Sequence, residues 1–218
     1  MAPIRRFAAI GDIHAEDRRL EHVLAWLARH PLDAILSVGD LCDGAGDLDR
    51  CITLLRTDNT LGVRGNHDRW FIDDPFRHVE ARPATLAHLR ALPVTRRVPT
   101  VRGDLLLCHG VGDHDTIRLH PDHDSSRTGA QTALEALLAD PDLHLVVGGH
   151  THKRMVRHFP RRAGPPLVFI NPGTLHRDYP AGFAVVDLER RLVELHDLDE
   201  RPGGALVIDL AETHALDP

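Results

Sequence analysis

The feature that most constrains the fold of this chain is a repeated succession of a short apolar run, a glycine beside a polar residue, and a segment with helical spacing of apolar residues. The apolar runs, which we expect to be strands, cover residues 6–10, 34–38, 60–63, 105–108 and 143–147. Helical segments are expected around residues 20–27, 48–55, 85–92 and 134–139. Strands that alternate with helices in this way predict an α/β fold whose first sheet contains parallel strands.

The last third of the chain has a different pattern. Its short apolar runs are separated by turn residues and cover residues 167–170, 183–186, 192–195 and 205–208. They predict a meander of antiparallel strands that forms a second sheet. The Pro-rich piece 161–166 is interpreted as a loop or hairpin tip. Because neither a repeat nor a low-complexity linker interrupts the chain, residues 1–218 are expected to form a single domain.

Composition excludes several classes of protein. With 42% hydrophobic and 27% charged residues, the 218-residue chain has the make-up of a soluble globular protein. Its net charge of −6 makes nucleic acid an unexpected partner and argues against binding to an anionic membrane. No segment approaches the roughly 18 uninterrupted apolar residues of a membrane span, and the N-terminus lacks the apolar region of a signal peptide. The three cysteines indicate neither a disulfide framework nor a thiolate zinc site, so a cytoplasmic location is expected.

Histidines and aspartates occur where the apolar runs end. The chain has 17 histidines, more than core packing explains. In open α/β sheets the loops beyond the carboxyl ends of parallel strands meet in one crevice, so side chains placed there can lie together. Oxygen and imidazole donors without thiolate suit manganese, iron or zinc in a catalytic setting. The residues at these run ends are Asp12, His14, Asp40, Asn66, His67, His109, His150 and His152.

The same residues form motifs in a fixed order. They are Asp12-Ile13-His14 (D-x-H), Gly39 to Asp43 (G-D-x-x-D), Gly65 to Asp68 (G-N-H-D), His109-Gly110, and Gly149 to His152 (G-H-T-H). In this order they resemble the motifs of the calcineurin-like metallophosphoesterases. The run Asn171-Pro172-Gly173-Thr174 resembles a further N-P-G-S/T element of the small bacterial phosphodiesterases and phosphatases of that superfamily.

The resemblance implies a fold and a metal site. The fold would be α/β, a four-layer αββα sandwich with two mixed β-sheets flanked by helices. Two divalent metal ions would lie about 3.5–4 Å apart in the crevice, with manganese as the first choice and iron, zinc or nickel as alternatives. The family pattern implies one metal held by Asp12, His14 and His152, a second held by Asn66, His109 and His150, and Asp40 as the bridge between them.

The resemblance also implies a reaction. A hydroxide that bridges the two ions attacks phosphorus in line, and the ions neutralise charge on the phosphoryl oxygens. His67, which neighbours a ligand without being one in the family pattern, is expected to protonate the leaving alkoxide as general acid. Asp43 is the first choice for orienting His67 and raising its pKa, with Asp68 as the rival. Aspartates in such positions can instead only cap the following helix or turn.

The sequence departs from one family pattern directly after Asp43. Protein Ser/Thr phosphatases and their bacterial relatives usually continue G-D-x-x-D with Arg-Gly, and that arginine grips phosphate, but Gly44 follows here. This departure weakens an assignment as a phosphoprotein phosphatase or a diadenosine tetraphosphatase, and it leaves the substrate-binding residues unknown. The replacements that lie near the motifs, each of which can equally be a solvated surface arginine, are Arg64, Arg69, Arg154 and Arg177.

The segment 112–126 follows the predicted ligand His109 and is rich in charge. It carries His114, His120 and His123 among four aspartates. A solvated acidic loop is favoured over a lid beside the site or an extra metal site.

Two other groups of residues can border the site. Trp70, Phe71 and Phe76 can stack on a base, although local packing is favoured. For Asn171 and Thr174, a tight turn that leads into the next strand is favoured over a role in lining a phosphate pocket.

The ordered ligand set predicts a metal-dependent phosphoric ester hydrolase that acts on a small phosphodiester or phosphomonoester. A phosphodiesterase is favoured, because small relatives with the N-P-G-S/T element often cleave diesters. The first alternative is an interaction scaffold on the same fold, but such relatives typically lose ligands or the acid histidine, and this chain retains them. The second is a metal-dependent nuclease, disfavoured because the chain is short and has no basic stripe. The substrate, the native metals and the oligomeric state stay open.

Overall fold

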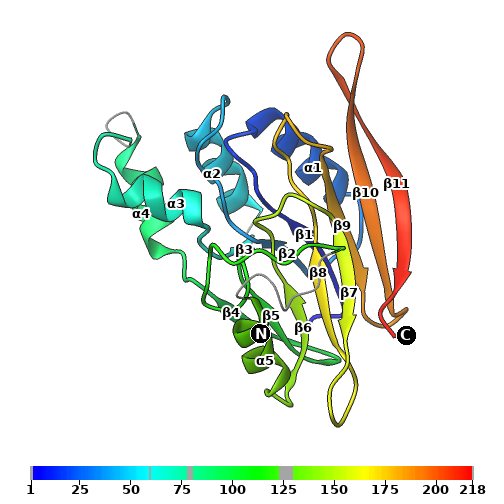
Figure 1. Cartoon of the computed structure of the whole chain (residues 1–218). Helices are drawn as coiled ribbons and strands as arrows, with labels where there is room; N and C mark the ends of the chain where they lie inside the picture. Colours follow the sequence, from blue (N-terminus) through cyan, green and yellow to red (C-terminus); the bar gives the residue numbers. More distant parts are fainter. Residues whose placement is uncertain (1, 59, 78–80, 123–129, 218) are drawn as a thin grey trace.

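Two mixed β-sheets pack face to face, and helices cover their outer faces (Figure 1). The computed structural model describes residues 2–58, 60–77, 81–122 and 130–217, and within them it contains five α-helices and sheets of six and five strands. One apolar cluster lies between the sheets, and two further clusters lie under the helices on either side. This arrangement confirms the αββα sandwich expected from the sequence.

The six-stranded sheet has the order β11-β10-β9-β1-β2-β3. Its first three strands along the chain are parallel to one another, and β9 pairs antiparallel with β1. The last three strands form the antiparallel half of the sheet. The strands are β1 (Arg6–Ile10), β2 (Ala34–Ser37), β3 (Leu61–Gly62), β9 (Gly182–Asp187), β10 (Leu192–Arg201) and β11 (Ala205–Ala215).

The five-stranded sheet has the order β4-β5-β6-β8-β7. Its three inner strands are parallel, and each edge strand pairs antiparallel with its neighbour. The loop between β7 and β8 is therefore the hairpin tip predicted for residues 161–166. The strands are β4 (Arg96–Thr100), β5 (Gly103–Leu107), β6 (Leu143–Val147), β7 (Met155–Phe159) and β8 (Leu167–Asn171).

The strand β1 shows why its sequence is apolar on both sides. Phe7 and Ala9 belong to the cluster between the two sheets, whereas Ala8 and Ile10 belong to the cluster under the helices. Because successive side chains of a strand point to opposite faces, a strand covered on both faces needs apolar residues at every position.

Helices cover both outer faces. Leu20, Val23, Leu24 and Leu27 form the buried stripe of α1 at the spacing of a helical face. The side chain of Asp47 accepts a hydrogen bond from the backbone N–H of Arg50 and caps α2. Of the helices that the structure describes, none has the length and apolar character needed to span a membrane. The helices are α1 (Asp17–Leu27), α2 (Leu48–Thr57), α3 (Asn66–Asp73), α4 (Pro83–Ala91) and α5 (Ala130–Leu138).

The prediction that the C-terminal third forms the second sheet is wrong. The strand β8 lies inside the five-stranded sheet beside β6, and β9, β10 and β11 join the six-stranded sheet beside β1. The second sheet is instead built around the parallel strands β5, β6 and β8. Both sheets therefore combine a parallel part with antiparallel edge strands, and residues from the last third complete each of them.

Candidate metal centre

The loops that follow five parallel strands of the two sheets meet at one place. Asp12 and His14 follow β1, Asp40 follows β2, and Asn66 begins α3 after β3. From the other sheet, His109 follows β5 and both histidines of the G-H-T-H motif follow β6. The convergence predicted from the sequence is thus present, although the strands come from two packed sheets and not from one.

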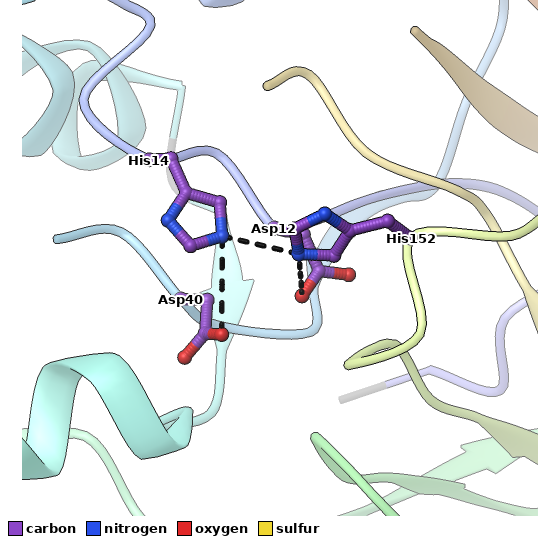
Figure 2. Close-up of side chains that lie close together, drawn as sticks. All are labelled: Asp12, His14, Asp40 and His152. Carbon is purple, nitrogen blue, oxygen red and sulfur yellow. Dashed lines mark hydrogen bonds and ion pairs between the residues drawn. The ribbon is translucent and has the colours of Figure 1, made fainter. Parts of the chain in front are cut away.

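The first group of donor atoms comes from four residues (Figure 2). The Nε2 atoms of His14 and His152 lie 3.2 Å apart, and Nε2 of His152 lies 3.6 Å from Oδ1 of Asp12. Oδ2 of Asp40 lies 4.0 Å from Nε2 of His14. All four donor atoms lie within 4.8 Å of one another, which is close enough for one cation to contact them together.

The second group shares Asp40 with the first. Asp40, His109 and His150 offer donor atoms within 4.8 Å of one another, and Oδ2 of Asp40 lies 3.2 Å from Nε2 of His109. The side-chain amide of Asn66 lies 2.9 Å from Nε2 of His109 and 2.8 Å from Nδ1 of His150. Every ligand predicted from the sequence therefore belongs to one of two neighbouring groups, with Asp40 in both.

Backbone carbonyls fix the orientation of two of the rings. Nδ1 of His109 lies 2.8 Å from the carbonyl oxygen of Val38, and Nδ1 of His14 lies 2.9 Å from that of Cys42. A carbonyl oxygen only accepts, so Nδ1 of each ring must carry the proton. In the neutral rings Nε2 then presents its lone pair to the centre of the group, which is the form that binds a metal.

Burial and charge tune the same residues. Burial raises the pKa of Asp12 to about 8, and it lowers the pKa of His150 to about 4 and that of His152 to about 3. Burial also disfavours charge on Asp40 and His109, but their mutual attraction outweighs it. The pKa of Asp40 consequently lies below its usual value, and the pKa of His109 rises to about 10. A cation would stabilise both the ionised carboxylates and the neutral rings.

A buried carboxylate oxygen is a further reason why these residues fit a divalent cation. Oδ2 of Asp40 is buried and makes no hydrogen bond among the residues that the structure describes, although Nε2 of His109 lies 3.2 Å away. An ionised oxygen left in this state is costly, whereas a metal ion satisfies it. Carboxylate, amide and imidazole donors are the set that manganese, iron and zinc share.

The backbone at the site is strained. Outside glycine, positive φ values favour short polar residues and cost about 1–3 kcal/mol when the surroundings impose them. All but Ala15 and Arg191 of the described residues with this conformation are predicted site residues. The described residues other than glycine that have a positive φ are Asp12, His14, Ala15, Asp40, Asp43, His150, His152 and Arg191. Strain of this kind persists where the surrounding structure fixes the loops, as the packed sheets do here.

Asp43 contacts the predicted general acid. Its Oδ2 atom lies 2.7 Å from Nδ1 of His67 and also accepts a hydrogen bond of 2.8 Å from Nη1 of Arg77. The hydrogen bond that His67 donates to Asp43 raises the pKa of His67 and lowers the pKa of Asp43. Sequence reasoning missed Arg77, because it lies outside every motif.

The rival Asp68 has different partners. Its carboxylate accepts hydrogen bonds from the backbone N–H groups of Leu41, Cys42 and Gly65, at 2.7, 3.1 and 2.9 Å. It caps the first turn of α3 and ties it to the loop after β2. Asp68 therefore holds two motif loops together, and Asp43 is the aspartate that pairs with His67.

Asn171 and Thr174 support the loops that carry ligands. Nδ2 of Asn171 donates to the carbonyl oxygen of Gly149, and Oγ1 of Thr174 donates to that of Asp12, at 2.8 and 2.7 Å. Oδ1 of Asn171 also accepts from the backbone N–H of Gly173. These contacts agree with the favoured interpretation as a turn, and they add a role in positioning the loops after β1 and β6.

Position 44 cannot carry the arginine of the family pattern with this backbone. A Cβ atom at Gly44 would lie 1.5 Å from the carbonyl oxygen of His14. Of the replacements considered, three form ion pairs elsewhere, in the pairs Arg69–Asp115, Arg154–Asp197 and Arg177–Glu16. The backbone N–H of Arg64 donates to the carbonyl oxygen of Pro93.

Arg118 is an arginine that lies beside the candidate site. Its Nε atom is 3.5 Å from Nε2 of His150, one of the candidate ligands. Arg118 belongs to the segment 112–126, which drew attention only for its histidines. His123 and residues 124–126 lie outside the described part of the chain. Within that part, no residue of this segment belongs to a group that could hold a metal.

Comparison with known proteins assigns the family. The sequence matches the calcineurin-like phosphoesterases over residues 5–154, so the chain belongs to this family. Membership supports hydrolase activity, and together with the clustered donors it indicates divalent metal binding. Comparison with curated proteins finds no match.

Solved structures share the fold. A metallophosphoesterase from Sphaerobacter thermophilus is 24% identical, with a TM-score of 0.68, over 90% of this chain and 89% of that one. YfcE, a phosphoesterase from E. coli, is 15% identical with a TM-score of 0.58, over 97% and 100% of the two chains. Vps29 from Entamoeba histolytica, in a complex with zinc, is 18% identical with a TM-score of 0.57, over 97% and 99%. At these identities the likeness concerns the fold.

Proposed function

We propose that this protein is a dinuclear metal-dependent hydrolase of small phosphate esters. The observation that carries the proposal is the pair of donor groups that share Asp40, whose buried Oδ2 atom makes no hydrogen bond in the described part of the chain and lies 3.2 Å from Nε2 of His109. Asp12, His14 and His152 would hold one cation, and Asn66, His109 and His150 the other. When bound, two divalent cations supply a nucleophilic hydroxide at neutral pH and neutralise charge on the phosphoryl group.

The side chains beside the cations complete the reaction. His67, held through Nδ1 by Asp43, carries a proton on its other ring nitrogen, Nε2, to the leaving oxygen. The P–O bond to that oxygen breaks while the oxygen of water bonds to phosphorus, so the products are an alcohol and a phosphate carrying one ester fewer. Arg118, beside His150, would contact the phosphoryl oxygens in place of the arginine that position 44 cannot carry.

The activity test uses a nitrophenyl phosphodiester and the matching monoester with manganese. We expect turnover that a chelator abolishes, and loss of turnover in Asp40→Asn and His67→Ala. Full activity in the chelated protein, or unchanged turnover in both variants, would contradict the proposal. Preference for the monoester would identify a phosphatase instead of the phosphodiesterase that we favour.

Metal analysis separates the enzyme from an interaction scaffold on the same fold. We expect about two manganese ions per chain at saturation, the number that a bridged site binds. Fewer than one ion per chain would favour the scaffold.

A further inference from the structure

Two of the exposed aromatic side chains in the described part of the chain, Trp70 and Tyr179, lie against residues of the candidate site. The chain has six Phe, two Trp and one Tyr, and those that are exposed are Trp70, Phe76 and Tyr179. Trp70 lies against His67 with ring centroids 4.9 Å apart, and Tyr179 lies against His152 at 4.5 Å. Phe76 directly precedes Arg77, whose guanidinium group binds Asp43. Local packing, favoured from the sequence, is found for Phe71, which is buried under the helices, and for Trp70, which packs against His67 but stays partly exposed.

Trp70 is placed by the same helix as the general acid. His67 and Trp70 lie three residues apart on α3, so their side chains share one face of the helix. The side chain of Trp70 is 39% exposed although it packs against His67. An apolar ring that is left in water costs free energy, and a planar ligand that covers it recovers that energy.

The neighbour of the Trp70 indole ring, Arg69, is itself held in place. The guanidinium carbon of Arg69 lies 5.9 Å from the Trp70 ring centroid. Two hydrogen bonds, of 2.7 and 3.2 Å, hold that guanidinium group on the carboxylate of Asp115. A platform held in this way loses little conformational freedom when a ligand stacks on it.

The position of His67 tells which part of the substrate reaches Trp70. In an in-line displacement the leaving oxygen lies on the far side of phosphorus from the attacking oxygen. The general acid must be within hydrogen-bond reach of that leaving oxygen. Because Trp70 contacts the acid, the indole ring lies near the place that the group attached to the leaving oxygen would occupy.

We propose that the site hydrolyses phosphate esters whose leaving group carries a planar aromatic ring system, such as a nucleobase, and that this ring system stacks on Trp70. The inference rests on the proposed function and deepens it. Every base offers a π face, so stacking of this kind selects for planarity and aromaticity and not for one base.

A mixed diester tests the proposal through its products. In adenosine 5′-methylphosphate either ester bond to phosphorus can break, and both leaving groups are primary alkoxides. If the base stacks on Trp70, water replaces the nucleoside oxygen, which takes the proton of His67, and the products are adenosine and methyl phosphate. Cleavage of the other bond yields adenosine 5′-phosphate and methanol. We expect adenosine to be the main product, and adenosine 5′-phosphate as the main product would overturn the proposal.

Variants test whether the preference for cleaving the adenosine ester bond depends on the Trp70 ring. We expect Trp70→Leu, which keeps apolar bulk without an aromatic face, to lower the ratio of adenosine to methanol about tenfold, the scale that base stacking gives. Trp70→Phe should keep most of the ratio. The matched control is Tyr179→Leu, which removes the exposed aromatic beside His152 and should keep the ratio of the unmodified protein. A ratio that follows Tyr179 and not Trp70 would contradict the assignment.

Fluorescence measures stacking without turnover. The chain has two tryptophans, so Trp26→Phe leaves Trp70 as the sole source of tryptophan emission. We expect adenosine to quench this emission in the manganese-loaded protein, and ribose at the same concentration to leave it unchanged. In Trp70→Phe, where Trp26 alone emits, adenosine should have no effect. Equal responses to adenosine and ribose would overturn the proposal.

The two levels of inference fail separately. Metal-dependent hydrolysis of a nitrophenyl diester, combined with no preference for the adenosine ester bond, would refute the role of Trp70 and leave the proposed function intact. Absence of hydrolysis of every ester, with adenosine still quenching Trp70, would refute the proposed function.

Discussion

A single oxygen atom, Oδ2 of Asp43, links the candidate general acid to an arginine that no motif contains. It contacts both His67 and Arg77, and it raises the pKa of His67. The pairing of Asp43 with His67 was predictable, because both residues belong to motifs of the family. The participation of Arg77 was not, because a lone surface arginine carries no local signal.

The first prediction at this scale concerns Asp43→Asn. His67 must be protonated to act, so activity falls as pH rises through its pKa. Removing the carboxylate charge lowers that pKa, and the alkaline limb of the kcat/KM profile should move to lower pH. At neutral pH the rate should fall about tenfold or more, a fraction of the usual effect of a general acid.

The control for that prediction is Asp74→Asn. Asp74 pairs with Arg77 at 3.6 Å but does not contact His67, so the alkaline limb should stay in place. An unshifted limb in Asp43→Asn would refute the role given to the Asp43–His67 pair.

The second prediction concerns Arg118. If its guanidinium group contacts the phosphoryl oxygens, Arg118→Ala should lower kcat/KM about ten- to hundredfold, since a charged hydrogen bond contributes about 1.5–3 kcal/mol. Arg118→Lys should recover part of the loss. Arg102→Ala, which removes an ion pair with Asp217, serves as the control. Equal kinetics in the Ala variant and the unmodified protein would leave the phosphate contact to another residue.

The third prediction concerns protons released when metal binds. In the metal-free protein the pKa of Asp12 is raised to about 8 and that of His109 to about 10, so both groups hold a proton at pH 7. Metal displaces these protons, and the water that becomes the bridging hydroxide loses one more, so titration at pH 7 should release about three per chain, falling to about two at pH 9. Calorimetry in buffers of different ionisation enthalpy measures this number. A release that does not change with pH would contradict the assigned ligands.

At the scale of elements, the position of a strand in its sheet explains whether the sequence pattern revealed it. The strands β1, β2, β5 and β6 contain apolar residues on both faces, so each appears in the sequence as a short apolar run that shows its position. The edge strands β4 and β7 were missed, because an edge strand tolerates charged and half-buried residues that weaken the pattern. Helix α3 was missed because its first turn consists of motif residues, which we interpreted as functional residues and not as the start of a helix.

The prediction at this scale concerns Gly44→Ala. The new Cβ would meet the carbonyl oxygen of His14, so the loop that carries His14 must move. We expect a loss of about 2 kcal/mol or more in the free energy of unfolding and weaker manganese binding. Gly44→Arg should behave in the same way and should not supply a phosphate contact.

A glycine of the β7–β8 hairpin tip is the matched control. Gly164 has a φ of +85°, and a Cβ there would meet nothing within 4 Å. Gly164→Ala should therefore cost only about 1 kcal/mol, from backbone strain, and leave metal binding unchanged. Equal effects of the two substitutions would show that the close approach to His14 does not matter.

At the scale of the whole molecule, strands from the last third complete both sheets. One apolar cluster joins β1, β2 and β9 of one sheet to β5, β6 and β8 of the other. We propose on this basis that residues 1–218 form one domain, as expected from the sequence. Unfolding in denaturant should then be a single transition when followed by fluorescence and by circular dichroism.

Metal removal belongs to the same scale, because the ligands come from both sheets. A cation that binds only the folded chain stabilises it by about 2.7 kcal/mol at one hundred times its dissociation constant. For a chain of this size, chelation should therefore lower the Tm by about 5–10 °C. Asp40→Asn should show a smaller shift on chelation than the unmodified protein. A Tm that does not respond to chelator or manganese would argue against metal binding in the fold.

Local patterns in the sequence predicted the α/β class and the polar residues at the strand ends, because apolar strands and helical stripes can be recognised without the rest of the chain. The sandwich of two sheets and the ligand sets followed from the resemblance of the ordered motifs to a known family. The tertiary structure decided which strands share a sheet, confirmed Asp43 over its rival Asp68 as the contact of His67, and showed that Trp70 and Arg118 border the site. Those facts depend on contacts between segments far apart in sequence, which packing of the two sheets creates and no local pattern encodes.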